Sequence, residues 1–181
     1  HKYRGITGCR KIEKCRPRAH RQYRDLHIYR YKYAKGSSEC GAKDNNMVYV
    51  FLADGFEEIE ALCPVDIMRR AGIEVRTTAI GTRREVRGAH NITVSADMLF
   101  SELHIEGTPE LLMLPGGMPG ATHLREHDGL CTLLKTASAA GSRLAAICAA
   151  PFILGELGLL EGREATCYPG FEEQLFGAKV S

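Results

Sequence analysis

Residues 142–151 read SRLAAICAAP, and this stretch decides the fold. The run SRLAAI is apolar enough for a strand buried on both faces of a sheet. Cys148 follows it directly, and residues 149–162 have the apolar spacing of a helix. A strand that passes into a helix through a cysteine with small neighbours predicts an α/β sheet with the cysteine at its carboxyl edge.

The same alternation of strand and helix extends upstream to Met47. The predicted elements are strand 48–53, helix 57–72, strand 73–81, strand 92–97, strand 110–115, helix 124–141, strand 142–147, helix 149–162 and strand 164–168. This order predicts a doubly wound parallel sheet over residues 47–181, covered by helices on both faces. A turn and a helical stub end the sequence, which we interpret as a domain whose C-terminal elements are missing.

The charge distribution divides the chain at Met47. Residues 1–46 carry 13 Lys and Arg against 4 Asp and Glu, whereas residues 47–181 carry 11 against 18. We interpret residues 1–46 as a basic segment outside the domain, either disordered or upstream of a start at Met47. The alternatives are a nucleic-acid or membrane-binding arm, a targeting segment, or a zinc site. The zinc ligands would come from Cys9, Cys15, His20, His27 and Cys40.

The composition is that of a globular protein without a membrane span. No run approaches the ~18 to 20 apolar residues that a transmembrane helix needs, and the first residues lack the apolar core of a secretory signal. The seven cysteines are odd in number and scattered, which favours reduced thiols over disulfides. We therefore expect a cytoplasmic protein.

Cys148 is the strongest candidate for chemistry. Its small neighbours, Ala145, Ala146, Ala149 and Ala150, permit a tight turn that exposes the side chain. A helix that begins just after it favours the thiolate, which is both a nucleophile and a target for oxidation. The alternative is an inert buried cysteine. The strand, cysteine and helix together favour the reactive one.

A glycine-rich turn, LPGGMPG (114–120), closes the predicted strand 110–115. At Gly116 and Gly117 no side chain prevents the backbone N–H groups from approaching a ligand, so this turn can form an oxyanion cradle beside Cys148. Clusters of glycine and proline also form ordinary turns. The residues alone leave both interpretations open.

Glu60 lies in the first turn of the predicted helix 57–72. We expect Ile59, Leu62 and Cys63 to face the core, with Glu60 at the edge of that stripe. An acidic residue in this position commonly complements the helix dipole from the surface. The functional alternative is a carboxyl in the mouth of the sheet, protonated by burial, that donates a hydrogen bond to the thiolate.

The positions of the histidines limit which kind of catalytic triad the chain can form. All seven precede Cys148, so a triad with a histidine downstream of the nucleophile is excluded. His90 enters the predicted strand 92–97. It is a candidate for the site, and a surface position is the alternative.

Four motifs resemble, in order and spacing, those of the ThiJ/PfpI superfamily: DGFEEIE (54–60), PVDIMRRAG (64–72), LPGG (114–117) and AAICAAP (145–151). The resemblance covers residues 47–181. It is greatest to the branch of the Parkinson-disease-associated protein deglycase and bacterial YajL. It implies a flavodoxin-like fold of the class I glutamine amidotransferase-like type and a homodimer.

The resemblance also implies roles for individual residues. Cys148 would be the nucleophile, Glu60 its hydrogen-bond partner, and backbone N–H groups near Gly117 and Ala149 the oxyanion donors. His90 falls where the family has a basic residue near the site. The protease-like branch has histidine immediately after the nucleophile, whereas this chain has Ala149, so peptidase activity is not expected.

The implied activity is that of a cysteine-dependent glyoxalase or protein deglycase. Its substrates would be small aldehydes of the α-oxoaldehyde class or glycated protein side chains, and we expect neither a cofactor nor a metal. The alternative is a redox-sensing chaperone whose cysteine is oxidised and which has little turnover. Nucleic acid and membranes are not expected as partners.

Overall fold

The computed structural model describes residues 45–181. The interpretations of the basic segment, including its zinc and nucleic-acid alternatives, concern residues that lie almost wholly outside this range. Within it, no helix is long and apolar enough to cross a membrane.

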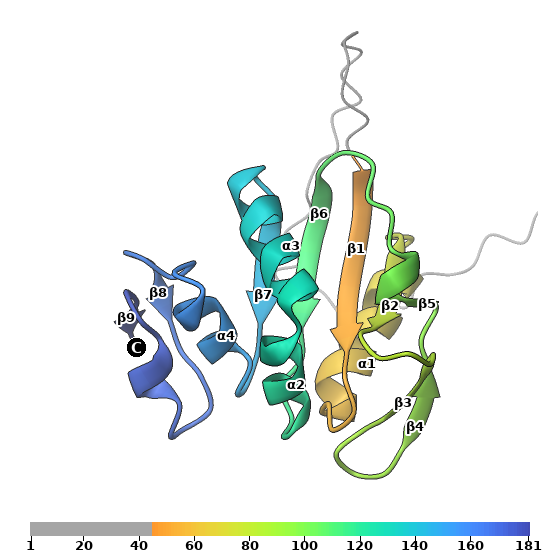
Figure 1. Ribbon diagram of the computed structural model, residues 1–181, viewed down its shortest axis with the longest axis horizontal. Helices are drawn as coiled ribbons and strands as arrows, with labels where there is room; N and C mark the ends of the chain where they lie inside the picture. Colours follow the sequence, from red (N-terminus) through yellow and green to blue (C-terminus); the bar gives the residue numbers. More distant parts are fainter. Residues whose placement is uncertain (1–44) are drawn as a thin grey trace, which may run out of the picture. The chain divides into compact units, whose positions relative to one another are not determined.

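A five-stranded parallel sheet forms the centre of the domain (Figure 1). Its order is β5-β2-β1-β6-β7. The strands are β1 (Asn45–Leu52), β2 (Val75–Ala79), β5 (Met98–Leu99), β6 (Pro109–Leu114) and β7 (Arg143–Ala146). The chain adds strands to one side of β1 and then to the other, so the direction of winding reverses between β1 and β6. The predicted doubly wound fold is confirmed.

Strand β1 is buried on both faces, as its continuous apolar sequence predicts. Tyr49 and Phe51 belong to the core on one face, and Val50 and Leu52 belong to the core on the other, because side chains alternate along a strand. Helix α1 (Glu58–Arg70) covers the second of these faces. The first is covered by α2 (Gly120–Glu126), α3 (Asp128–Ala139) and α4 (Pro151–Glu156).

Helix α1 turns a different side to the sheet from the one the sequence predicts. Its buried residues are Glu58, Ala61 and Val65, whereas Ile59 is 73% exposed and Cys63 is exposed. The prediction that Ile59 and Cys63 face the core is therefore wrong. Ala61 and Val65 lie buried in the core that β1 shares with α1, whereas the larger Ile59 and Ile67 side chains are exposed.

The predicted helix 124–141 is two helices. Helix α2 begins earlier, at Gly120, and ends at Glu126, and α3 begins at Asp128, with His127 between them as the N-cap of α3. The Nδ1 atom of His127 accepts a hydrogen bond from the N–H of Leu130 at 3.0 Å and so caps α3. This cap fixes the break that apolar spacing alone did not indicate.

The predicted strand 92–97 does not join the central sheet. Strand β4 (Thr93–Ser95) pairs antiparallel with β3 (Glu85–Arg87) in a separate hairpin. The edge of the central sheet is formed instead by β5, which is followed by the 3-10 turn η1 (Phe100–Glu102).

The C-terminal part is also shorter in regular structure than predicted. Helix α4 begins at Pro151 and ends at Glu156. Of the predicted strand 164–168 only β8 (Glu164–Ala165) forms, and it pairs in parallel with β9 (Lys179–Val180) outside the central sheet. The 3-10 turn η2 (Glu172–Gln174) lies between them in the sequence.

Candidate functional site

Three loops meet at the carboxyl edge of the sheet. They follow β1, β6 and β7, the strands on either side of the point where the winding reverses, which is where doubly wound sheets bind ligands. The loop and first helical turn after β1 supply Glu60, the loop after β6 supplies Gly116 and Gly117, and the turn after β7 supplies Cys148 and Ala149. The structure thus brings together every predicted site residue except His90.

Cys148 has a backbone conformation that few residues other than glycine adopt. Its φ is +60°, in the left-handed region. The N–H of Ala150 donates to the carbonyl of Ile147 at 3.0 Å, and the N–H of Tyr168 donates to the carbonyl of Cys148 at 2.7 Å. These bonds hold the turn in its strained form, as is typical of functional sites. The side chain is half-buried, so the sulfur lies at the border between core and solvent.

Glu60 reaches this turn from the first turn of α1. Its backbone N–H donates to Oε2 of Glu57 at 2.7 Å, which caps the helix. Its own Oε2 accepts a hydrogen bond from the N–H of Gly116 at 2.8 Å. The carboxyl of Glu60 is therefore fixed to the loop after β6 rather than exposed for the helix dipole.

Gly116 is the point of closest approach between the loops. A Cβ atom at this position would lie 2.7 Å from the Cβ of Cys148 and 2.7 Å from Oε2 of Glu60. Contacts that short do not occur without a shift of the neighbours. The absence of a side chain at Gly116 is thus what allows the Glu60 carboxyl and the Cys148 thiol to interact.

The groups around the sulfur shift the pKa of the Cys148 thiol in opposite directions. Burial raises the pKa of the Cys148 thiol, and the hydrogen bond with Glu60 and the negative charge of an ionised Glu60 raise it further. Backbone N–H groups of Ala149 and Gly117 lower the pKa of the same thiol but do not outweigh these effects, so beside an ionised Glu60 the pKa of Cys148 lies above its ordinary value. Because α4 begins only at Pro151 and has six residues, these N–H groups, and not a helix starting at once, face the sulfur.

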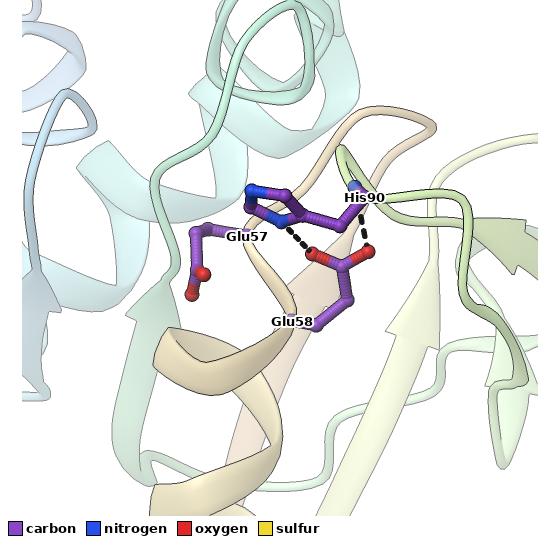
Figure 2. A group of neighbouring side chains, drawn as sticks. All are labelled: Glu57, Glu58 and His90. Atoms are coloured by element: carbon purple, nitrogen blue, oxygen red, sulfur yellow. Dashed lines mark hydrogen bonds and ion pairs between the residues drawn. The ribbon is translucent and has the colours of Figure 1, made fainter.

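His90 is held by a different carboxylate. Its Nδ1 atom lies 2.8 Å from Oε2 of Glu58, and its backbone N–H donates to Oε1 of Glu58 at 2.8 Å (Figure 2). The Glu58 side chain is only 5% exposed, whereas that of His90 is 70% exposed. A site role for His90 stays a prediction, but its contacts are with Glu58 and not with Cys148.

The contact between Glu58 and His90 favours the charged form of each group. Burial alone would raise the pKa of Glu58, but hydrogen bonds from the His90 ring and from backbone N–H groups outweigh burial and lower it. The hydrogen bond to Glu58, and then its charge, raise the pKa of His90. The sequence analysis did not predict that Glu58 is buried against His90. An acidic residue in the first turn of a helix is ordinarily exposed to solvent, where it interacts favourably with the helix dipole.

A sequence model of the DJ-1/PfpI family matches residues 46–181. The chain belongs to the DJ-1/PfpI family. Its curated relatives in this family include DJ-1 homolog B of Arabidopsis thaliana, 39% identical over 129 residues, which are 71% of this chain and 29% of the relative. A protein named deglycase from Pyrococcus abyssi is 32% identical over 133 residues, 74% of this chain and 78% of the relative.

Solved structures of DJ-1 proteins share the fold. A cysteine-to-alanine mutant of a DJ-1 superfamily protein from Salmonella typhimurium superposes with a TM-score of 0.70 at 33% identity, covering 75% of this chain and 73% of that one. Oxidized DJ-1 of Toxoplasma gondii gives a TM-score of 0.64 at 39% identity, covering 71% and 70%. The chain spans 29% and 33% of the lengths of its two Arabidopsis relatives. Activity, substrates and partners are therefore matters for proposal.

Replacing Gly116 with alanine tests whether the close approach matters. The added Cβ pushes Cys148 away from the N–H groups that stabilise its thiolate, so alkylation of Cys148 at neutral pH should slow, with a loss of stability of about 1–3 kcal/mol from overpacking. Gly81→Ala is the matched control, because no atom lies within 4 Å of a Cβ there. Equal alkylation rates of Cys148 in wild type and Gly116→Ala would contradict this account of the site.

Proposed function

We propose that the domain is a cysteine-dependent enzyme that converts α-oxoaldehydes to 2-hydroxy acids and acts by the same chemistry on their early adducts with protein side chains. One observation carries the proposal. The thiol of Cys148 interacts with an acid group, Glu60, and with two backbone N–H groups, those of Gly117 and Ala149. The family relatives named deglycase support this reaction class.

The proposal requires the shared proton to reside on Glu60 when Cys148 attacks. A thiolate and a carboxylate in contact do not both ionise readily, so the pair keeps one proton. The sulfur has two N–H partners, and Glu60 has one, from Gly116. A protonated Glu60 donates to the sulfur and lowers the pKa of Cys148, the reverse of its effect as a carboxylate.

The reaction then proceeds in three balanced steps. The thiolate forms an S–C bond with the aldehyde carbon, and the new oxyanion takes the Glu60 proton, giving a hemithioacetal. The ionised Glu60 removes the proton from the former aldehyde carbon and returns it to the adjacent ketone carbon. The hydroxyl proton on the former aldehyde oxygen passes to the former ketone oxygen, which gives a 2-hydroxy thioester. Water cleaves the S–C bond, releasing the 2-hydroxy acid and the thiol. The N–H groups of Gly117 and Ala149 stabilise the oxyanions that form beside the sulfur.

We place the protein in a reducing compartment, the cytoplasm. All four cysteines among residues 45–181 are free thiols: Cys63, Cys131, Cys148 and Cys167. A nucleophilic thiol stays active in a compartment where disulfides and sulfenic acids are reduced.

A redox-sensing role is the second candidate function. The N–H groups that stabilise an oxyanion would equally stabilise a sulfinate on Cys148, and a family member has been solved in oxidized form.

The central test is lactate formation from methylglyoxal without glutathione. Wild type should form lactate, and Cys148→Ser should lose about two orders of magnitude or more of kcat/KM, because the serine hydroxyl is not ionised at neutral pH. Cys131→Ser is the matched control, because Cys131 is another half-buried free thiol, located on α3 with its Sγ bonded to the carbonyl of Arg125. Unchanged turnover in Cys148→Ser would rule out the mechanism. A wild type that forms no lactate, while mild peroxide oxidises Cys148 selectively, would favour the redox sensor.

We also propose a homodimer formed through the outer face of α1. Ile59 is 73% exposed and Ile67 is 59% exposed, two turns apart on the same face of this helix. A second copy related by a twofold axis would present the same stripe and cover both. Ile67→Glu should therefore give monomers in sedimentation experiments, whereas Val180→Glu, at another exposed apolar residue, should not. A dimer that survives Ile67→Glu would place the interface elsewhere.

A further inference from the structure

We propose that Glu57, Glu58 and His90 form a binding site for one divalent transition-metal ion, next to the nucleophile but separate from it. A ligand atom from each of these side chains lies within 4.8 Å of the others. Figure 2 shows the His90 ring above the first turn of α1, with the two carboxylates below it. Cys148 is not part of this group. The resemblance implies only a basic residue near the site at His90, and the proposed reaction gives the three side chains no joint task.

Glu58 and His90 already have the spacing of two ligands on one ion. The Nδ1 atom of His90 and Oε2 of Glu58 are 2.8 Å apart. Two ligand atoms that each lie about 2.1 Å from a metal, at nearly a right angle, are separated by about 3 Å. An ion could therefore replace the proton between these atoms with little movement of either side chain.

Glu58 is oriented as metal ligands commonly are. Its other oxygen, Oε1, accepts hydrogen bonds from the N–H groups of His90 at 2.8 Å and Ile92 at 3.4 Å. Such bonds to the second oxygen fix the direction of a ligating carboxylate. Gly88 leaves room for this carboxylate, because a Cβ atom at position 88 would overlap Oε1 of Glu58. The carboxylate is thus preorganised and nearly excluded from water, which strengthens its attraction for a cation.

Glu57 completes the set from the N-cap of α1. One of its oxygens, Oε2, is bonded to the N–H of Glu60 at 2.7 Å, and this bond does not use the second oxygen. A ligand atom up to 4.8 Å from the others has to move closer to share an ion, and the half-buried Glu57 side chain has the rotamer freedom to do so.

The donor set defines the class of ion. One imidazole and two carboxylates suit Zn²⁺, Co²⁺, Fe²⁺ or Mn²⁺, and the two carboxylate charges balance a dication. Three protein ligands leave coordination positions for water. Because the His90 ring is 70% exposed, the ion could enter and exchange without unfolding of the domain.

Co²⁺ titration of the full-length reduced chain tests the site by visible absorption. We expect about one Co²⁺ per chain with ligand-field bands and without thiolate-to-cobalt charge transfer, since the ligands are nitrogen and oxygen. His90→Gln and Glu57→Gln should each weaken binding at least about tenfold. The Gln side-chain oxygen at position 57 can still cap α1, so that variant keeps the helix intact. Circular dichroism confirms the fold of each variant.

Two controls separate this site from others in the chain. His123→Gln removes another exposed histidine, and Cys148→Ser removes the neighbouring thiol. Both should bind Co²⁺ as wild type does. The proposal is overturned if wild type binds no Co²⁺, if folded His90→Gln binds it unchanged, or if Cys148→Ser abolishes binding. A charge-transfer band would show that thiolates elsewhere hold the ion, which also overturns the proposal.

Discussion

The site depends on the contact between the Glu60 carboxyl and the Cys148 thiol across Gly116. These groups come from segments almost ninety positions apart in the chain, and they meet because α1, the loop after β6 and the turn after β7 converge at one edge of the sheet. Gly116 has no side chain to separate them, and its N–H fixes the carboxyl at 2.8 Å. The strained turn at Cys148 then directs the sulfur to the same place.

In the proposed mechanism this contact determines the chemistry, because the carboxyl and the thiol share one proton. If the proton is on the sulfur, Cys148 is a weak nucleophile beside a carboxylate. If it is on Glu60, Cys148 is a thiolate that receives three hydrogen bonds, from Glu60, Gly117 and Ala149. The same donors would stabilise an oxyanion of a bound aldehyde or a sulfinate. Enzyme and redox sensor therefore share one geometry, and turnover distinguishes them.

Residues 57–60 show how one helical turn serves several purposes. Glu57 caps α1, Glu58 ties α1 to the segment after β3 through His90 and Ile92, and Glu60 reaches the nucleophile. Burial of the charged Glu58 is tolerated because its oxygens have hydrogen-bond partners. The segment around His90 is thus held beside the site without contributing to the Cys148 contact.

Local sequence was sufficient to predict the parts of the site that short motifs encode. The small residues around Cys148, the Gly116–Gly117 pair and the acidic first turn each lie at a strand end, and the parallel topology then brings strand ends together. Local sequence was not sufficient to predict which side chains are buried when their burial depends on a residue distant in the chain. Glu58 is buried because His90 and Ile92 lie against it, and apolar spacing wrongly favoured its neighbour Ile59. The break between α2 and α3 at His127 depends on a side-chain cap. The apolar run at residues 92–97 correctly indicated a strand, but such a run does not show whether the strand pairs in the central sheet or in a separate hairpin.

The most direct test of the central claim is the pKa of the Cys148 thiol, measured from the pH dependence of its alkylation with glutamate, glutamine or leucine at position 60. A protonated Glu60 is the strongest donor, Gln is a weaker one and Leu is none. The account predicts the lowest pKa of Cys148 with Glu60, a higher one in Glu60→Gln and the highest in Glu60→Leu. Equal values in all three, or a pKa of Cys148 that falls in Glu60→Gln because a negative charge has been removed, would contradict it.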